Sequence, residues 1–294
     1  MNRLYKRLFM FLFTVGVLFG SVFVTGVEAK KKAKWVYTKS TEYFHKADGT
    51  WKKSGSTTYK YDNAGRLLQS KSGKYKTKYT YNKQGLLIKV DANSINTHSY
   101  DYYTYTASGQ GKSHKWYQYD ELGSSEEYEY DSKDNVKKEK RCYTGDSTIV
   151  NEYKNTYSKG RLSKCIQIGN GKPFMTTKYT YYKDGTLKKK VSEEVKSKIK
   201  EIYEFDAKGR EIKHTHIEGD DFKEVNLFTY NEHGDLCKRI TQDIYKDPKK
   251  NKDSGEYVYE NLYKYDKNGN ITEVIDVLDG KELTKKTYEG YKKY

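Results

Sequence analysis

Residues 59–70 read YKYDNAGRLLQS, and the same pattern returns at 79–90 as YTYNKQGLLIKV and at 263–274 as YKYDKNGNITEV. Each copy has two aromatic residues two positions apart, then Asp or Asn, then Gly, then an aliphatic residue. Residues two apart on a strand share a face, and Asp, Asn and Gly suit tight turns. The stretch therefore predicts a β-hairpin that is repeated along the chain.

The first copy defines the expected geometry of each hairpin. Gly65 takes a positive φ and closes a three-residue loop, so that Asp62 pairs with Arg66. Tyr61 then lies opposite Leu67 on one face, an aromatic–aliphatic pair that contributes about 0.2–1 kcal/mol. The geometry is tested by the copy at Tyr157, which is one residue shorter, because a two-residue loop there still sets this tyrosine opposite an aliphatic residue, Leu162.

The pattern recurs ten times, and its copies begin at Tyr61, Tyr81, Tyr105, Tyr119, Tyr130, Tyr157, Tyr181, Phe205, Tyr230 and Tyr265. Five copies keep the full aromatic, glycine and aliphatic pattern. Their structural residues are Tyr61, Gly65 and Leu67; Tyr81, Gly85 and Leu87; Tyr181, Gly185 and Leu187; Tyr230, Gly234 and Leu236; and Tyr265, Gly269 and Ile271. The copies with Gly111, Ser125 or Glu211 at the aliphatic position are expected to be slipped, bulged or weak hairpins.

The composition limits the kind of core that the hairpins can build. The chain has 294 residues with 32 Tyr and 2 Pro, and its mean hydropathy is −1.05. A wide aliphatic core is therefore excluded, and tyrosine rings are expected to provide most of the buried apolar surface. We predict an all-β fold: a curved, open antiparallel meander of successive hairpins, solenoid-like, with tyrosines on its concave side and one domain over residues 30–294.

The motif Tyr61-Asp62…Gly65-Arg66-Leu67, with its copies at Phe205 and Tyr265, resembles the YD repeat of RHS-type and wall-associated bacterial proteins. The resemblance covers most of residues 42–290. It implies successive β-hairpins in a long coiling sheet, which large members of the family wrap into a shell around a toxin. This chain has few copies and no recognisable toxin domain after the last one, so the resemblance implies the fold and not toxicity.

Residues 1–29 have the pattern of a secretory signal peptide. Three basic residues precede the apolar run at 8–24, and Val27-Glu28-Ala29 fits a cleavage site. An uncleaved anchor is the alternative, since the run is slightly long for a signal and slightly short for a span. We expect cleavage after Ala29, a secreted or cell-surface-associated protein that begins at Lys30, and no stable membrane span after cleavage.

The net charge indicates the class of partner. The formal net charge is +16, and residues 1–29 contribute +2 of it, so residues 30–294 carry +14. Such a charge favours polyanions. Because an exported protein meets cell-wall polymers rather than nucleic acid, a polysaccharide or an anionic cell-wall polymer is the expected partner, and no nucleic acid is expected. The candidate ligand-binding residues are Trp51, Trp116, Lys112 and Lys115, with Trp116 expected on the outer face to stack on sugar rings.

The sequence holds no pattern that specifies a reaction, and we predict a non-enzymatic protein without catalytic residues, cofactor or metal. His214 and His216 share a strand face and are the best pair for a metal, with His233 as a conceivable third ligand. No CxxC spacing is present among Cys142, Cys165 and Cys237, and an odd number cannot form a closed disulfide framework.

Three functional hypotheses follow. The first is a binding module of the cell surface or cell wall for polysaccharide or anionic wall polymer. The alternative is a structural or partner-binding YD-repeat protein related to a larger RHS-type system, with uncovered sheet edges that accept a partner strand. An enzyme of unrecognised type is the third. Export, aromatic repeats and positive charge favour the first.

Overall fold

The computed structural model describes residues 35–145, 148–246 and 254–293, and all regular structure in them is β. The predicted signal peptide lies outside the described residues. The strands are β1 (Trp35–Val36), β2 (Lys39–His45), β3 (Trp51–Tyr61), β4 (Leu67–Ser72), β5 (Tyr75–Tyr81), β6 (Leu87–Asn93), β7 (His98–Tyr105), β8 (Gly111–Gln118), β9 (Glu121–Tyr130), β10 (Val136–Tyr143), β11 (Ile149–Ser158), β12 (Arg161–Gly169), β13 (Lys172–Tyr181), β14 (Leu187–Glu194), β15 (Ile199–Phe205), β16 (Glu211–Glu218), β17 (Phe222–Tyr230), β18 (Leu236–Tyr245), β19 (Gly255–Tyr265), β20 (Ile271–Leu278), β21 (Lys281–Glu289) and β22 (Lys292–Lys293).

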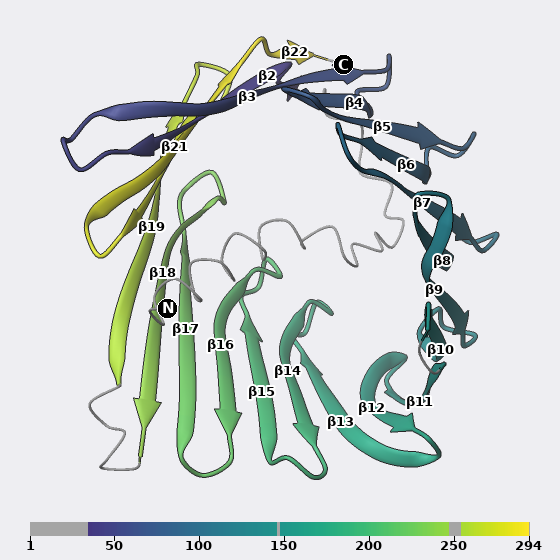
Figure 1. The fold of residues 1–294 in the computed structure, drawn as a ribbon. Coiled ribbons are helices and arrows are strands. Elements are labelled where there is room, and N and C mark those ends of the chain that lie inside the picture. Colours follow the sequence, from purple (N-terminus) through teal and green to yellow (C-terminus); the bar gives the residue numbers. More distant parts are fainter. Residues whose placement is uncertain (1–34, 146–147, 247–253, 294) are drawn as a thin grey trace.

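Strands β2–β21 form a closed antiparallel barrel of 20 strands in which each strand pairs with the next one along the chain (Figure 1). The ring is closed by β2 and β21, whose register runs from Lys39 opposite Glu289 to Phe44 opposite Thr284. The prediction of an open, solenoid-like meander is therefore wrong, although the all-β class is right. Twist and coiling accumulate over successive hairpins, and in this chain they bring the last strand beside the first.

The turn at Asp62–Arg66 has the predicted geometry. The backbone N–H of Asp62 donates to the carbonyl of Arg66 at 2.9 Å, and Gly65 has a φ of 71°. One carboxylate oxygen of Asp62 accepts hydrogen bonds from the N–H groups of Ala64 and Arg66, and the other accepts one from the Arg66 side chain. Asp thus stabilises the loop while Gly occupies the one position that disfavours a Cβ. Positive φ is found at all five predicted glycines, Gly65, Gly85, Gly185, Gly234 and Gly269.

The predicted cross-strand pairs are confirmed by the register. Tyr61 lies opposite Leu67, and in the short copy Tyr157 lies opposite Leu162. The other complete copies behave alike, with the pairs Tyr81–Leu87, Tyr181–Leu187, Tyr230–Leu236 and Tyr265–Ile271. The copies with Gly111 and Glu211 keep the same register, opposite Tyr105 and Phe205. A change of the aliphatic residue therefore does not shift these hairpins.

One copy departs from the pattern. Tyr119 and Asp120 are themselves the turn between β8 and β9, with φ values of 49° and 66°, and Gln118 pairs with Glu121. Gly123 lies inside β9 at a bulge and has no positive φ. The copy predicted at Tyr119 is therefore wrong, because a tighter two-residue loop forms before the expected one.

Successive hairpins are joined through the hydroxyl groups of the repeat tyrosines. In six copies a tyrosine hydroxyl reaches back to the strand that follows the previous turn and donates to a backbone carbonyl there; in the last copy this tyrosine is Tyr263. The pairs are Tyr81 to Leu67, Tyr105 to Leu87, Tyr130 to Gly111, Tyr181 to Leu162, Tyr230 to Glu211 and Tyr263 to Leu236. The hydroxyls of Tyr157 and Tyr265 donate instead to the carboxylates of Asp131 and Asp235. A ring provides apolar area within its own hairpin while its polar end attaches that hairpin to its neighbour.

The buried apolar core is small. Among the described residues the buried apolar side chains are Val36, Ile168, Val225 and Val277, whereas buried polar or charged side chains are more numerous. The sequence-based expectation that no wide aliphatic core exists is therefore confirmed. The fold is held together by backbone pairing, tyrosine rings and polar contacts along both faces of one closed sheet.

Candidate ligand-binding surfaces

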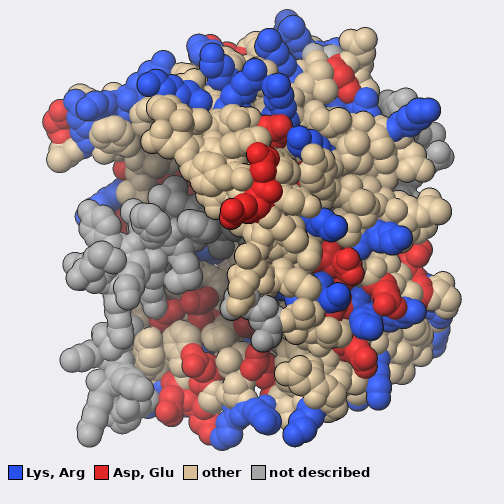
Figure 2. Space-filling model, turned by 45° about the vertical axis from the view of Figure 1, so that its right-hand side comes forward, with Lys and Arg blue, Asp and Glu red and all other residues tan. Residues whose placement is uncertain are grey.

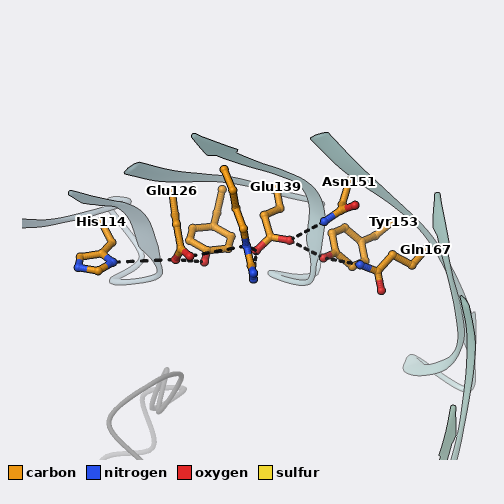
Figure 3. Close-up of polar contacts among 8 residues, drawn as sticks. His114, Glu126, Glu139, Asn151, Tyr153 and Gln167 are labelled. Atoms are coloured by element: carbon orange, nitrogen blue, oxygen red, sulfur yellow. Dashed lines mark hydrogen bonds and ion pairs between the residues drawn. The ribbon is translucent and has the colours of Figure 1, made fainter. Parts of the chain in front are cut away.

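The strand pleat divides the side chains of the barrel into an inner and an outer set. His114, Glu126, Glu139, Asn151, Tyr153 and Gln167 lie on the concave side of the sheet (Figure 3). Residues that pair directly across strands share a face of the sheet. Tyr79 pairs with Val90, Val90 pairs with Asp101, and Asp101 hydrogen-bonds His114, so Tyr79 lies on the same face as His114. The repeat tyrosines therefore line the inner face, and the residues that alternate with them face outward.

The four predicted ligand-binding residues are not brought together. Trp116 is two positions after His114 on β8 and shares its inner face. The ring of Trp116 packs on Gly123, because a Cβ added at Gly123 would lie 2.1 Å from Cζ3 of Trp116. The orientation predicted for Trp116 is therefore wrong. Lys115 faces outward opposite Tyr102, and Lys112 is exposed at the bulge that begins β8. The register reverses the expectation because Tyr117, not Trp116, pairs with the outer Tyr100.

Trp51 is the remaining predicted residue, and it lies on the outer face at the start of β3. Its ring centroid lies 4.8 Å from that of His45 and 4.8 Å from the ammonium of Lys285. The same ammonium lies 5.1 Å from the ring of Tyr43. Trp51 is thus an outward aromatic ring with a cation already against it.

A group of lysines on the outer face of β3–β5 was not predicted from the sequence. We call Lys60, Lys71, Lys76 and Lys78 the lysine patch. Lys71 and Lys76 are directly opposite on β4 and β5, and Lys60 and Lys78 flank Gln69 in the next row. Lys60, Lys71 and Lys78 are exposed and Lys76 is half-buried. The alternation of lysine with Tyr and Thr along β5 was the available signal, but only the register joins it to β3 and β4.

The lysine patch lacks compensating charge. In the described part of the chain no carboxylate oxygen lies within 4.0 Å of these four ammonium groups. Asp91 pairs with Lys78 in the register, but its carboxylate contacts Lys89, Asn93 and His98. Like charges placed directly opposite on a sheet are destabilising.

Four outer lysines elsewhere on the barrel are paired with carboxylates, whereas Lys164 and Lys178 lie directly opposite each other without an ion pair among the described residues. The ammonium-to-carboxylate distances are 3.7 Å for Lys189 and Glu204, 2.6 Å for Lys200 and Glu193, 3.5 Å for Lys238 and Glu260, and 2.6 Å for Lys264 and Glu273. Residues 35–90 contain 12 Lys or Arg and 3 Asp or Glu. Figure 2 shows Lys and Arg gathered over the upper part of the barrel, where Figure 1 places β2–β5. Positive charge is therefore concentrated in one sector.

The inner face carries a continuous polar network across β8–β12 (Figure 3), and Asp101 of β7 extends it through its contact with His114. Its centre is Glu139, which is 4% exposed and accepts hydrogen bonds from Arg141, Asn151 and Tyr153. Burial alone would raise the pKa of Glu139, but those three donors outweigh it and hold the pKa below its usual value. Burial and the bond to Glu139 raise the pKa of Tyr153. The network therefore keeps the Glu139 carboxylate ionised at neutral pH while it joins neighbouring strands of the barrel wall.

The histidine pair singled out in the sequence is engaged with one carboxylate. Glu201 contacts His214 Nε2 and His216 Nδ1, each at 2.6 Å, and Tyr203 stacks on His214 with centroids 4.4 Å apart. His233, the conceivable third ligand, instead stacks on Tyr265 at 4.0 Å. Over the described ranges, no group of three or more His, Cys, Asp or Glu is arranged to hold a metal ion. These contacts favour a structural role for the pair.

The three cysteines, Cys142, Cys165 and Cys237, are free thiols on separate strands. Burial raises the pKa of Cys165, so a smaller fraction of this thiol is in the reactive thiolate form. No helix in the described parts of the chain is long and apolar enough to cross a membrane.

Comparison with known proteins gives distant structural similarities. No protein-family model matches the chain, and no curated protein matches it in sequence. The Tc holotoxin pore of Photorhabdus luminescens is 15% identical over 81% of this chain, with a TM-score of 0.34, and a porin-like protein from Bacteroides uniformis is 11% identical over 86%, with a TM-score of 0.35. The match covers 16% of the toxin chain and 95% of the porin-like one. TM-scores this low establish neither a shared fold nor a shared function, so the resemblance to YD-repeat proteins rests on the turn motif.

Proposed function

We propose that this protein is an exported, non-enzymatic barrel that binds an anionic polymer of the cell surface or cell wall through the lysine patch. The observation that carries the proposal is the placement of Lys60, Lys71, Lys76 and Lys78 on three neighbouring strands without carboxylate partners. A polyanion that neutralises such a group relieves its internal repulsion and gains from counterion release.

Aromatic rings on the same outer face support a contribution from sugar rings of the polymer. Trp51 lies on β3, the strand that also carries Lys60, although the two residues are at opposite ends of it. Trp116, on the inner face, is not available to a ligand on this surface. Stacking of sugar rings on Trp51 would persist at high salt, where charge attraction is screened. We therefore expect Trp51→Ala to reduce the polymer binding that remains at high salt.

The test measures sedimentation of the purified protein, residues 30–294, with isolated cell wall. The variant carries Lys60→Gln, Lys71→Gln, Lys76→Gln and Lys78→Gln. The matched control carries Lys189→Gln, Lys200→Gln, Lys238→Gln and Lys264→Gln, which removes the same charge from lysines that already have carboxylate partners. We expect the first variant to lose most of the bound fraction at about 0.1 M salt and the control to retain it. Equal loss in both would mean that net charge alone is responsible.

The alternative function is structural or partner-binding, as part of a larger YD-repeat system. Among the described strands, β2–β21 each have a neighbour on both sides, so addition of a partner strand to the sheet requires the ring to open. Absence of wall binding at any ionic strength would favour this alternative, with a partner that contacts a face of the barrel instead of an edge.

A further inference from the structure

The lysine patch lies across the joint between β4 and β5, and the side chains at this joint attract each other little. We propose that the ring opens locally at the β4–β5 joint and that a polyanion bound to the lysine patch keeps the joint closed. This inference rests on the proposed function, because it concerns the regulation of the same site.

The cross-strand pairs of β4 and β5 contribute little to holding the two strands together. Lys71 lies directly opposite Lys76, and like charges in this position are destabilising. None of the four register pairs joins two apolar side chains, and the ring of Tyr75 is 68% exposed. The other three pairs are Gln69–Lys78, Ser70–Thr77 and Ser72–Tyr75.

Stabilising side-chain contacts of the joint lie at one end of it. The hydroxyl of Tyr81 donates to the carbonyl of Leu67 at 2.9 Å, and the guanidinium of Arg66 lies 5.1 Å from the centre of the Tyr81 ring. At the other end the chain turns through Gly73 and Lys74, which adds one more exposed cation. The strands are therefore held at the Tyr81 end, while the repelling lysines lie between that end and the turn.

The hairpin of β10 and β11 shows how a pairing of the same length is held elsewhere in the barrel. It also has four register pairs within the described residues, and in it Lys138 lies opposite Glu152. Glu139 lies opposite Asn151 and accepts a hydrogen bond from its side chain at 3.1 Å. Opposite charges and a buried carboxylate thus support β10–β11, so the two hairpins form a matched comparison.

The pairing that closes the ring, between β2 and β21, is also supported by opposite charges. The ammonium-to-carboxylate distance is 2.9 Å for Lys39 and Glu289 and 2.8 Å for Lys286 and Glu42. These four residues form two cross-strand pairs in the register. Local opening is therefore expected at β4–β5 before it occurs where the two ends of the sheet meet.

A polyanion favours the closed joint because the charge density of the patch depends on strand pairing. Paired strands lie about 4.8 Å apart, so Lys71 and Lys76 present two neighbouring charges only while β4 and β5 are paired. Separation of the strands spreads these charges and weakens the attraction for a polymer. Because a ligand shifts an equilibrium by its difference in affinity for the two states, a bound polyanion shifts the joint towards closure.

The test measures hydrogen–deuterium exchange of residues 30–294 by mass spectrometry, with inorganic polyphosphate as the probe. In about 0.02 M salt we expect amides of β4–β5 to exchange at least about tenfold faster than those of β10–β11. Addition of polyphosphate, or of salt to about 0.5 M, should slow β4–β5 by about tenfold, because each reduces the lysine repulsion. Equal exchange in the two hairpins, or failure of either addition to slow β4–β5, would overturn the inference.

Two single variants separate repulsion at the joint from the net charge of the protein. Lys71→Gln removes the directly opposed pair, so it should slow exchange at β4–β5 without any polyanion and should reduce the response to polyphosphate. The control Lys200→Gln removes the same charge from a lysine that lies 2.6 Å from Glu193, and exchange at β4–β5 should stay as in wild type. Unchanged or faster exchange at β4–β5 in Lys71→Gln would contradict the inference.

Sedimentation with cell wall keeps the outcome for the proposed function separate. If the four-glutamine variant loses wall binding while polyphosphate leaves exchange of wild-type β4–β5 unchanged, the proposed function stands and the inference fails. If polyphosphate slows β4–β5 while wild type does not sediment with cell wall at any salt concentration, the joint responds to polyanions as inferred and the assignment to a wall polymer fails.

Discussion

The hydroxyl of Tyr81 donates a hydrogen bond to the backbone carbonyl of Leu67 at 2.9 Å, so the repeat tyrosine of one hairpin is attached to the hairpin before it. The same kind of bond recurs at Tyr105, Tyr130, Tyr181 and Tyr230. It gives tyrosine a role that phenylalanine, present in the copy at Phe205, cannot fill with the same apolar area. The hydroxyl joins units that are otherwise connected only by their backbone ladder.

The Tyr81 hydroxyl is therefore expected to contribute to stability. Tyr81→Phe keeps the ring and removes the bond to Leu67, which should lower the free energy of unfolding by about 0.5–1.5 kcal/mol. Tyr75→Phe is the matched control, because Tyr75 is 68% exposed and should tolerate the change. Urea unfolding followed by circular dichroism measures both. An equal effect of the two changes would contradict a structural role for the hydroxyl.

Gly185 is expected to be sensitive for two reasons. Its φ is 99°, and an added Cβ would lie 2.6 Å from Nη2 of Arg161, whose guanidinium lies over the ring of Tyr181. Gly171 also has a positive φ, 73°, but nothing lies within 4 Å of its added Cβ. In both alanine variants, the positive φ should lower the free energy of unfolding by about 1–2 kcal/mol. Gly185→Ala should be the less stable of the two in thermal unfolding, and the reverse order would show that Arg161 moves aside at little cost.

Gly123 and Trp116 should behave as a coupled pair. Gly123→Ala directs a methyl group into the Trp116 ring, and overpacking of this kind costs about 1–3 kcal/mol. Trp116→Leu in the same chain should relieve the collision, so the double variant should be more stable than additivity of the single changes predicts. A double-mutant cycle in urea measures the coupling, and strict additivity would mean that the ring does not rest on Gly123.

Glu139 gives a pH-dependent contribution whose sign is defined. Its folded-state pKa lies below the unfolded value, which is about 4.3 for glutamate. The stability that it contributes is therefore fully present above that unfolded value and is lost as the pH falls through the folded-state pKa. Glu139→Gln should destabilise the protein at pH 7, and its deficit relative to wild type should shrink as the solution is acidified below pH ~4.

Unfolding by urea over a range of pH checks the expectation for Glu139. Glu129→Gln is a suitable control, because Glu129 lies on the exposed outer face in an ion pair with Lys137. Surface pairs of this kind contribute little, so the control should follow wild type at every pH. A Glu139→Gln deficit that stays constant down to pH 2 would show that the carboxylate charge is not the source of the effect.

The local parts of the fold were accessible from the sequence, and the global ones were not. The turn at Asp62–Arg66 and the pair Tyr61–Leu67 are determined by residues close in the chain, so their chemistry predicts them. The pairing of β2 with β21 has no local signal, because it depends on the sum of twist over every hairpin. The copy at Tyr119 failed for a local reason, since two residues with positive φ formed a shorter loop than the motif implies.

The candidate surface was partly accessible for the same reason. Net charge indicated a polyanion, but the sequence does not show which lysines share a face across strands. Lys71 and Lys76 become neighbours only through the β4–β5 register. Trp116 faces inward because its neighbour Tyr117 is the residue that pairs with the outward-facing Tyr100 on β7. A bulge shifts the faces by one residue, which is enough to reverse an orientation inferred from alternation.

The contact between Lys39 and Glu289 has a consequence for how the molecule assembles. The two residues are 250 positions apart, so direct closure of such a loop in an unstructured chain would cost about 5 kcal/mol in entropy. Hairpins that form first shorten the path, because each added pair carries the growing edge closer to β2. The last pairing step then depends on every earlier one, and until it occurs both end strands expose unpaired backbone to other chains. Folding speed and resistance to aggregation are thus expected to be most sensitive to changes at this seam, even where the stability of the finished ring is little altered.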